Sequence, residues 1–349
     1  MTGKSFTIVT LVLTAICIVP VAFFNYWIDP MWTFHTNNEH NQIQTVINER
    51  QQKTNRLYYS NETYDTLLIG SSRTTYIDQR EFTGRNVFNY AVADLSFKDY
   101  DTMIEFAKKE NGKEFETIII GTDFFKTSIA QTSTPSDFYT YIEQVNEPFY
   151  RYKNLLSLDV LDYSRHNYDL AKAGIVSEAR TYNRDNIASA AEIDADKREA
   201  ETAGKINKFR NQFFKDDKYE YNPEFKEMLT TIQANNPNTE FIIFTTPIYS
   251  GLFDALLEEG RYPDYVRWLK DLTDVFGEVH HFMYPNPVTD NIENYFDGHH
   301  FYPHVGTMIA HVLSGEYSTD IPSDFGVVLQ KEDLNEQLRR LLEIDVESE

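Results

Sequence analysis

Two short polar segments, far apart in the chain, contain the residue types that nucleophilic catalysis requires. The first, from Gly70 to Arg73 (GSSR), directly follows an apolar run. A serine on such a tight turn stands above the end of a strand, where backbone N–H groups favour developing negative charge. Serine is also a common first residue of helices, so this segment needs a partner before it indicates catalysis.

The second segment, from Asp297 to Pro303 (DGHHFYP), supplies that partner. An aspartate three residues before a histidine can place its carboxylate against one imidazole nitrogen and leave the other to accept a serine proton. The loop has two other interpretations: its histidines cap the following helix, or Asp297, His299, His300 and His304 bind zinc. The serine turn and the order of the strands favour a triad without a metal ion.

Buried strands must position both segments. Apolar runs predict strands over 65–70, 86–92, 115–121 and 240–247, with a weaker one over 279–282. Helical patterns alternate with these strands, for example over 98–109 and 265–276. The alternation predicts an α/β fold with a doubly wound parallel sheet, in which ligands bind beyond the carboxyl ends of the strands. His280 and His281 are expected to be ordinary strand residues.

An uncharged apolar run from Phe6 to Phe24 has the length of about 20 residues that a helix needs to cross a bilayer. Lys4 precedes the run, and Tyr26 and Trp27 follow it like an interfacial aromatic belt. We therefore expect a single-pass cell-membrane protein with a cytoplasmic N-terminus and an extracytoplasmic domain. A cleaved signal peptide and a buried core helix are the alternatives, but no small-residue cleavage site follows the run.

The region over 129–222 departs from the strand–helix alternation. It is rich in Tyr, Asn, Asp and Lys, has no convincing strand, and contains an amphipathic pattern over 188–214. We interpret it as a helical insertion that either covers one end of the sheet or forms a lid. The expected organisation is a cytoplasmic N-terminus (1–4), a transmembrane anchor (5–27), a stalk (28–60), an α/β domain (61–128 and 223–318), the insertion (129–222) and a C-terminal helical tail (319–349).

The composition excludes several classes of binding partner and of structural site. The 349 residues include 32 basic and 54 acidic side chains, and 32 − 54 gives a net charge of −22, which nucleic-acid phosphates would repel. An aromatic content of 15% argues against global disorder. The single cysteine excludes an intrachain disulfide and a cysteine-based zinc site. The triad chemistry needs no cofactor.

Together these motifs resemble the SGNH/GDSL hydrolase superfamily over roughly residues 64–313. They are most similar to its membrane-anchored, extracytoplasmic bacterial branch, which includes alginate and peptidoglycan O-acetyltransferases and the D-alanyl transfer protein of lipoteichoic acid assembly. The segments that carry this resemblance are 25–30 (NYWIDP), 70–73 (GSSR), 120–125 (IGTDFF), 297–300 (DGHH) and 324–327 (DFGV). The resemblance implies a flavodoxin-like sheet, with Ser72 as nucleophile, Asp297 as orienting acid and His300 as base.

The resemblance further implies a serine O-acyltransferase or esterase that moves acetyl groups onto or off a cell-surface or secreted polysaccharide. Its implied partner is a membrane-bound O-acyltransferase that exports acyl groups. The sequence does not separate transfer from hydrolysis, since water and a sugar hydroxyl are equivalent acceptors.

The sequence departs from the superfamily where donors to an oxyanion are expected. Asp94 stands near an expected glycine, and Asp123 replaces an asparagine, although an ionised aspartate only accepts hydrogen bonds. A lost donor typically costs about 3 kcal/mol in the barrier. The candidates for oxyanion or substrate contacts are Ser71, Arg73, Asn89, Asp94, Asp123 and His299. The same departure also fits a non-catalytic assembly or binding protein of a polysaccharide or teichoic acid modification complex.

Overall fold

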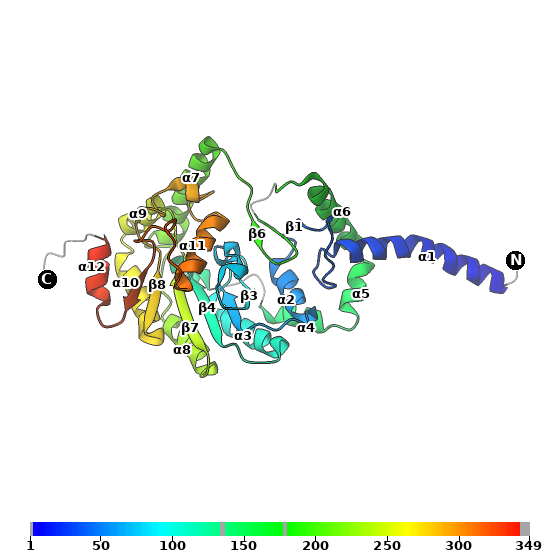
Figure 1. Cartoon of the computed structure of the whole chain (residues 1–349), viewed down its shortest axis with the longest axis horizontal. Coiled ribbons are helices and arrows are strands. Elements are labelled where there is room, and N and C mark those ends of the chain that lie inside the picture. Colours follow the sequence, from blue (N-terminus) through cyan, green and yellow to red (C-terminus); the bar gives the residue numbers. More distant parts are fainter. Residues whose placement is uncertain (1–2, 133–136, 177–179, 343–349) are drawn as a thin grey trace. The chain divides into compact units, whose positions relative to one another are not determined.

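The computed structural model describes residues 3–132, 137–176 and 180–342 (Figure 1). The chain divides into two compact units, each built from two separate segments. The larger unit comprises Thr63–Asp137 and Glu192–Glu349, and the smaller comprises Met1–Glu62 and Phe138–Ala191. These units differ from the predicted partition, since residues 28–60 share a unit with 138–191 and residues 192–222 belong with the sheet.

A six-stranded sheet forms the centre of the larger unit, in the order β3-β2-β4-β7-β8-β9. Five strands are parallel, and only β9 runs antiparallel, against β8. This confirms a mixed α/β fold with a mostly parallel sheet. Counted along the chain, the five parallel strands have the order 2-1-3-4-5. Their bounds are β2 Thr66–Ile69, β3 Val87–Asn89, β4 Thr117–Thr122, β7 Glu240–Thr245, β8 Glu278–His281 and β9 Val327–Gln330.

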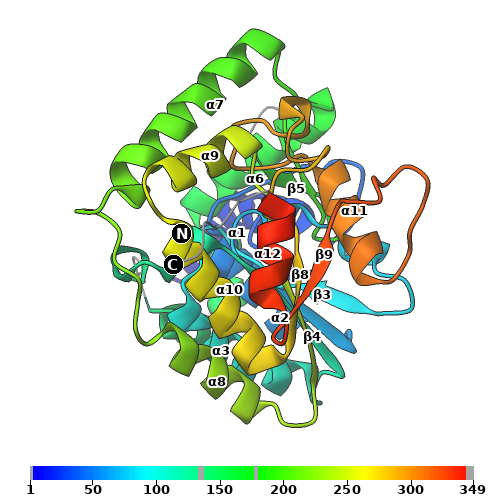
Figure 2. The same ribbon diagram turned by 90° about the vertical axis from the view of Figure 1, so that its left-hand side faces the viewer.

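Helices cover both faces of this sheet, and the central strands β2 and β4 are buried along their whole length. Ile118, Ile119 and Ile120 of β4 have no exposed surface, as expected for apolar runs in parallel strands. The helices α3 (Phe97–Asn111), α8 (Phe225–Asn235) and α10 (Tyr262–Phe276) pack together. Figure 2 shows them on one side of the sheet and α11 (Pro303–Leu313) on the other.

Two further helices of the larger unit lie near the carboxyl ends of the strands. They are α7 (Ala195–Phe209), which continues into one π-helical turn (Arg210–Phe214), and α9 (Ser250–Glu258). The two helices pack against each other. The predicted helix over 188–214 therefore begins later than expected, because Ala188 and Ser189 form strand β6. The final helix α12 (Leu334–Leu342) follows β9, and the predicted end of this helix near 344 lies outside the described residues.

The smaller unit contains a three-stranded sheet of very short strands, β1 (Gln44–Thr45), β5 (Thr181–Tyr182) and β6 (Ala188–Ser189). Its helices are α2 (Glu49–Tyr59), α4 (Tyr139–Asn146), α5 (Tyr150–Leu155) and α6 (Leu158–Ala173). The helices of the predicted insertion are thus present, but the sheet was not anticipated. Two-residue strands carry no period-2 pattern from which they could be recognised.

Residues 28–60 are packed into this unit rather than forming the predicted stalk. Buried ion pairs connect them to the second segment: Arg184 Nη2 lies 2.7 Å from Asp29 Oδ2, and Arg180 Nη1 lies 2.9 Å from Glu49 Oε1. The polar composition that suggested a solvated stalk therefore reflects side chains that are paired inside a domain.

The N-terminal helix α1 (Gly3–Ile28) is long and apolar enough to cross a membrane, a property that signal sequences share. Every residue from 3 to 20 is exposed, whereas Asn25 and Ile28 are buried against the smaller unit. The helix contacts α5 and α6, which Figure 1 shows beside its C-terminal end.

Candidate active site

Ser72 lies on the turn that joins β2 to a short 3-10 helix (Thr74–Tyr76). The turn packs against β4 through Thr74, whose side chain fits between two glycines. A Cβ atom on either Gly70 or Gly121 would collide with Thr74 Oγ1, so that the Thr74 side chain or the backbone would have to shift. The glycines that end the first and third predicted strands therefore allow the serine turn to sit directly on the sheet.

The structure brings Ser72 together with the loop that precedes α11. Ser72 Oγ lies 3.0 Å from His300 Nε2, and His300 Nδ1 lies 2.8 Å from Asp297 Oδ2. Because Nδ1 faces a carboxylate, that nitrogen carries the proton and Nε2 is the acceptor toward the serine hydroxyl. The three residues thus form a hydrogen-bonded chain of a serine, a histidine and a carboxylate, an arrangement in which a hydroxyl can be activated as a nucleophile.

The loop is shaped by the same carboxylate that orients the imidazole. Asp297 Oδ1 accepts hydrogen bonds from the backbone N–H groups of His299 at 3.0 Å and His300 at 2.7 Å. Gly298 between them has a φ of +69°, a region that favours glycine. The four-residue segment from Asp297 to His300 is therefore a folded turn in which one carboxylate oxygen bonds the backbone and the other faces the ring.

Aromatic rings fix the plane of the His300 imidazole. The Phe296 ring stacks on it with a centroid separation of 5.4 Å and an interplanar angle of 2°, and the Tyr76 ring meets it edge-on at 6.4 Å. A ring held between two aromatic side chains has few alternative rotamers, so its Nε2 stays directed at Ser72.

Lys205 of α7 is a further charged residue at this site that the sequence did not reveal. Its Nζ lies 2.7 Å from Asp297 Oδ2, the oxygen that also faces His300. Burial disfavours the charged carboxylate, but the neighbouring His300, His299 and Lys205 together hold the pKa of Asp297 well below its usual range. Asp297 is therefore an ionised residue that pairs with the Lys205 ammonium and accepts a hydrogen bond from the His300 ring.

Ser71, Arg73 and Asp123 form a buried polar cluster behind the serine turn. Arg73 Nη2 lies 2.5 Å from Asp123 Oδ1, both side chains are 1% exposed, and the hydroxyl groups of Ser71 and Thr246 also donate to the Asp123 carboxylate. Arg73 additionally donates to the carbonyl oxygen of Thr246 at 3.3 Å. Asp123 thus acts here as an acceptor that fixes the turn.

Two of the predicted oxyanion candidates are engaged elsewhere. The amide group of Asn89 donates to the carbonyl oxygens of Thr74 at 3.1 Å and Ile77 at 2.9 Å, so it braces the 3-10 turn. The Asp94 side chain is exposed, has a backbone φ of +56°, and forms an ion pair with Lys126. The Asn89 amide is therefore engaged within the fold, and the Asp94 carboxylate is paired with Lys126, which leaves the backbone N–H of Asp94 as the group at that position that can donate.

His299 is buried among aromatic rings beside the triad. The rings of Phe209 and Phe125 lie 4.7 Å and 5.3 Å from its imidazole, and burial lowers the pKa of His299 well below its ordinary value. His304 turns away from the triad and bonds through Nε2 to Asn294 Oδ1 at 2.9 Å. Within residues 3–132, 137–176 and 180–342, no group of three or more His, Cys, Asp or Glu side chains could hold a metal ion.

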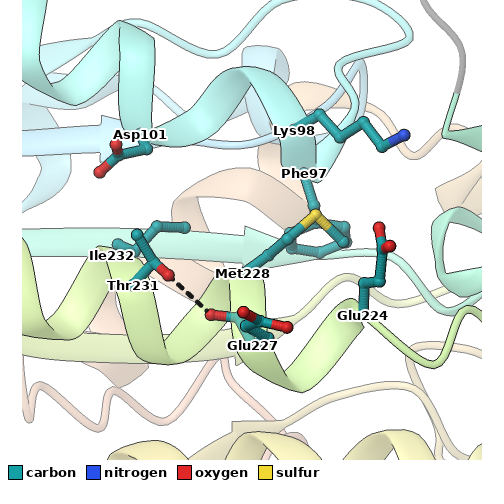
Figure 3. A pocket seen from close by; sticks show the side chains of 8 residues that line it. All are labelled: Phe97, Lys98, Asp101, Glu224, Glu227, Met228, Thr231 and Ile232. Carbon is teal, nitrogen blue, oxygen red and sulfur yellow. Dashed lines mark hydrogen bonds between the residues drawn. The ribbon is translucent and has the colours of Figure 1, made fainter.

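A separate surface groove lies between α3 and α8 (Figure 3). Its floor is apolar, from Phe97, Met228 and Ile232, and carboxylates of Asp101 and Glu227 stand at its rim. None of the triad residues lines it, so we assign it no role in the chemistry.

Comparison with models of protein families, with curated proteins and with solved structures found no match to this chain.

Proposed function

We propose that this protein is a membrane-anchored serine esterase or O-acyltransferase that acts outside the cytoplasmic membrane. The observation that carries the proposal is the chain of contacts from Ser72 through His300 to Asp297, at 3.0 Å and 2.8 Å. The order 2-1-3-4-5 of the parallel strands supports it, because this is the order of flavodoxin-like sheets and the serine lies at a carboxyl strand end.

In the proposed reaction, Ser72 Oγ attacks the acyl carbonyl carbon while His300 Nε2 takes the hydroxyl proton. Collapse of the tetrahedral intermediate breaks the bond to the leaving oxygen, which receives that proton from His300. The acyl-serine then reacts with water or with a sugar hydroxyl, again with His300 as base, and Ser72 is restored. Asp297 remains ionised and stabilises the imidazolium at each step.

The choice of an acetyl group and of a polysaccharide acceptor rests on the sequence resemblance alone. The side chains of Arg73, Asn89 and Asp123 are all engaged within the fold. The proposal therefore places none of them on the oxyanion, and we expect hydrolysis in solution to be slow. A partner or acceptor that completes the site would raise the rate.

The test is hydrolysis of an acetyl-ester reporter by the detergent-solubilised full chain. Ser72→Ala removes the nucleophile and is expected to lose nearly all of the activity. Ser71→Ala is the matched control, since it removes a neighbouring hydroxyl that only bonds Asp123, and it is expected to keep most of the activity. Equal turnover by the parent and Ser72→Ala would instead favour a binding or assembly protein.

A further inference from the structure

The smaller unit carries a group of exposed apolar side chains beside the C-terminal end of α1. Phe149 and Leu158 are 76% and 69% exposed, and Tyr152 and Leu156 are each 56% exposed. Tyr152 lies on α5, Phe149 and Leu156 flank that helix, and Leu158 is the first residue of α6. Scattered single apolar residues need no explanation, but a group of this kind marks an interaction surface. We call these four residues the α5 patch.

The α5 patch is tied rigidly to α1. The buried amide of Asn25 donates to the carbonyl oxygens of Leu155 and Ser157, each at 3.1 Å. Ser164 of α6 returns a hydrogen bond to Asn25 Oδ1 at 2.9 Å. The turn that contains Leu156 therefore lies at the level of Asn25 along the helix.

The length of α1 determines how deep in the bilayer the turn with Leu156 lies. Lys4 is charged, so the hydrocarbon core begins after it, and the exposed residues 5–20 then span only about 24 Å of helix. A hydrocarbon core is about 30 Å thick. The remaining turn must come from residues 21–24, of which Val21, Ala22 and Phe24 are partly covered by the unit. Any tilt of the helix brings the smaller unit still closer to the bilayer.

We propose that the α5 patch docks in the outer interface of the bilayer, so that the smaller unit is partly immersed beside its own anchor. This inference rests on the proposed use of α1 as an uncleaved membrane anchor. Aromatic and leucine side chains are the residues that membrane interfaces favour. Lys153 fits the same surface, because its long stem can lie on apolar groups while its ammonium reaches water and Glu147 at 3.0 Å.

The backbone at Phe149 gives independent support. Phe149 has a φ of +63°, which is strained for a bulky side chain, and yet its ring is the most exposed of the four. Strain of this kind persists where it serves a contact. In the isolated chain the Phe149 ring is mostly exposed to water, whereas in a bilayer interface it would be buried among lipid.

The charges nearby indicate which lipids are involved. Both signs of charge are exposed near the α5 patch, with Lys153 on α5 and Arg165, Asp159 and Asp162 on α6. The local charges therefore give no strong preference for anionic headgroups, and apolar burial provides the binding energy. We expect docking on zwitterionic lipid that is insensitive to salt.

The experiment measures the depth of single fluorescent labels in the full chain, reconstituted through α1 into phosphatidylcholine nanodiscs. Cys17 is the only cysteine and is replaced by serine. New cysteines at Phe149 or Leu156 receive the label, and nitroxide lipids with the quencher near the headgroup are added. Tyr317, which is 73% exposed in the larger unit, is the control position. Thermal unfolding checks that each variant is folded.

Loss of fluorescence at 149 and 156, with little loss at 317, would support docking. Unquenched labels at 149 and 156 that water-soluble iodide reaches would overturn it. Labels shielded from both quenchers would also overturn it, because another protein or a second copy would then cover the patch. In the wild-type chain, reaction of Cys17 with a water-soluble thiol reagent would instead show that α1 does not span the bilayer, which is a failure of the anchor itself.

Discussion

At the scale of single residues, the proposed triad of Ser72, His300 and Asp297 includes a carboxylate for which Lys205 competes. Lys205 Nζ and His300 Nδ1 share one oxygen of Asp297. The positive charge of Lys205 therefore weakens the electrostatic stabilisation that Asp297 gives to the protonated imidazole of His300. This competition gives the proposed triad a measurable pH signature.

Replacing Lys205 with methionine should move the acidic limb of the pH–activity profile to higher pH. Without the lysine, Asp297 stabilises the imidazolium more strongly, so a higher pH is needed to obtain the neutral base. Turnover on the alkaline plateau should change little. The measurement is ester hydrolysis between acidic and alkaline pH, with Lys205→Arg as the charge-retaining control. An unmoved acidic limb in Lys205→Met would show that the ion pair is purely structural.

Asp297→Asn should fold and yet be nearly inactive. An amide of the same size can leave the wrong imidazole nitrogen protonated, a change that costs about 10⁴ in turnover in a serine protease. His300→Ala should lose a similar amount, and the double variant should be little worse than either, because the groups act as one unit. Strictly additive losses would mean that Asp297 and His300 act separately.

At the scale of elements, the serine turn, the Asp297–Tyr302 loop and α7 hold the site together. Gly298 of the loop has a positive φ, and a Cβ there would lie 2.7 Å from Thr202 Cγ2 of α7. The loop and the helix thus approach each other as closely as a glycine allows.

Gly298→Ala should lower both stability and turnover. The left-handed conformation alone costs an L-residue about 1–2 kcal/mol, and the contact with Thr202 adds to it. Adding Thr202→Ala should relieve the contact but not the backbone strain, so the double variant should recover only in part. Thermal unfolding and ester hydrolysis measure both quantities. Unchanged behaviour of Gly298→Ala would show that α7 does not press on the loop.

Strand β8 carries a buried neutral histidine that should control acid stability. His281 Nδ1 lies 2.9 Å from Thr245 Oγ1 and its Nε2 lies 2.6 Å from the Tyr265 hydroxyl, and burial lowers the pKa of His281 to about 3. The unfolded chain binds a proton near pH 6.5 and the folded chain does not. Stability should therefore fall as the pH drops from about 6.5 toward 3, by at most about 5 kcal/mol.

The measurement is denaturant unfolding across that pH range. His281→Gln should be less stable at neutral pH but should show a flatter dependence on pH. His166→Gln, at an exposed position of the smaller unit, is the control and should leave the dependence unchanged. A parent protein with the same stability at pH 4 and pH 7 would contradict the assignment.

The elements show what local sequence can and cannot predict. The buried strands were predictable because apolar runs such as Ile118–Ile120 have only one way to be buried. The serine turn and the Asp297 loop were located because their residue types are tied to strand and helix ends. Lys205 could not be predicted as a residue of the site, since nothing in the sequence of a charged helix indicates which lysine contacts a carboxylate 92 residues away. The short strands β5 and β6 and the packing of residues 28–60 depend on partners distant in sequence.

At the scale of the whole molecule, the proposed topology places only the N-terminus in the cytoplasm. Protease treatment of intact cells or protoplasts should then digest the chain beyond α1 and leave α1 in the membrane. Permeabilised cells show whether the protease can digest the whole chain, and protection of a cytoplasmic protein shows that the membrane is intact. Full protection of the chain behind an intact membrane would reverse the orientation.

The separation of Ser72 and His300 by 228 residues has a consequence for biosynthesis. Contacts between residues so distant in the chain form slowly, because a long loop must close before they can be made. In the proposed topology, Ser72 would cross the membrane long before His300 during synthesis from the N-terminus. A product truncated ahead of Asp297 would then hold the proposed anchor and the serine turn yet lack the proposed esterase activity. Activity should therefore appear only as the last seventh of the chain emerges, later than the arrival of the protein at the membrane.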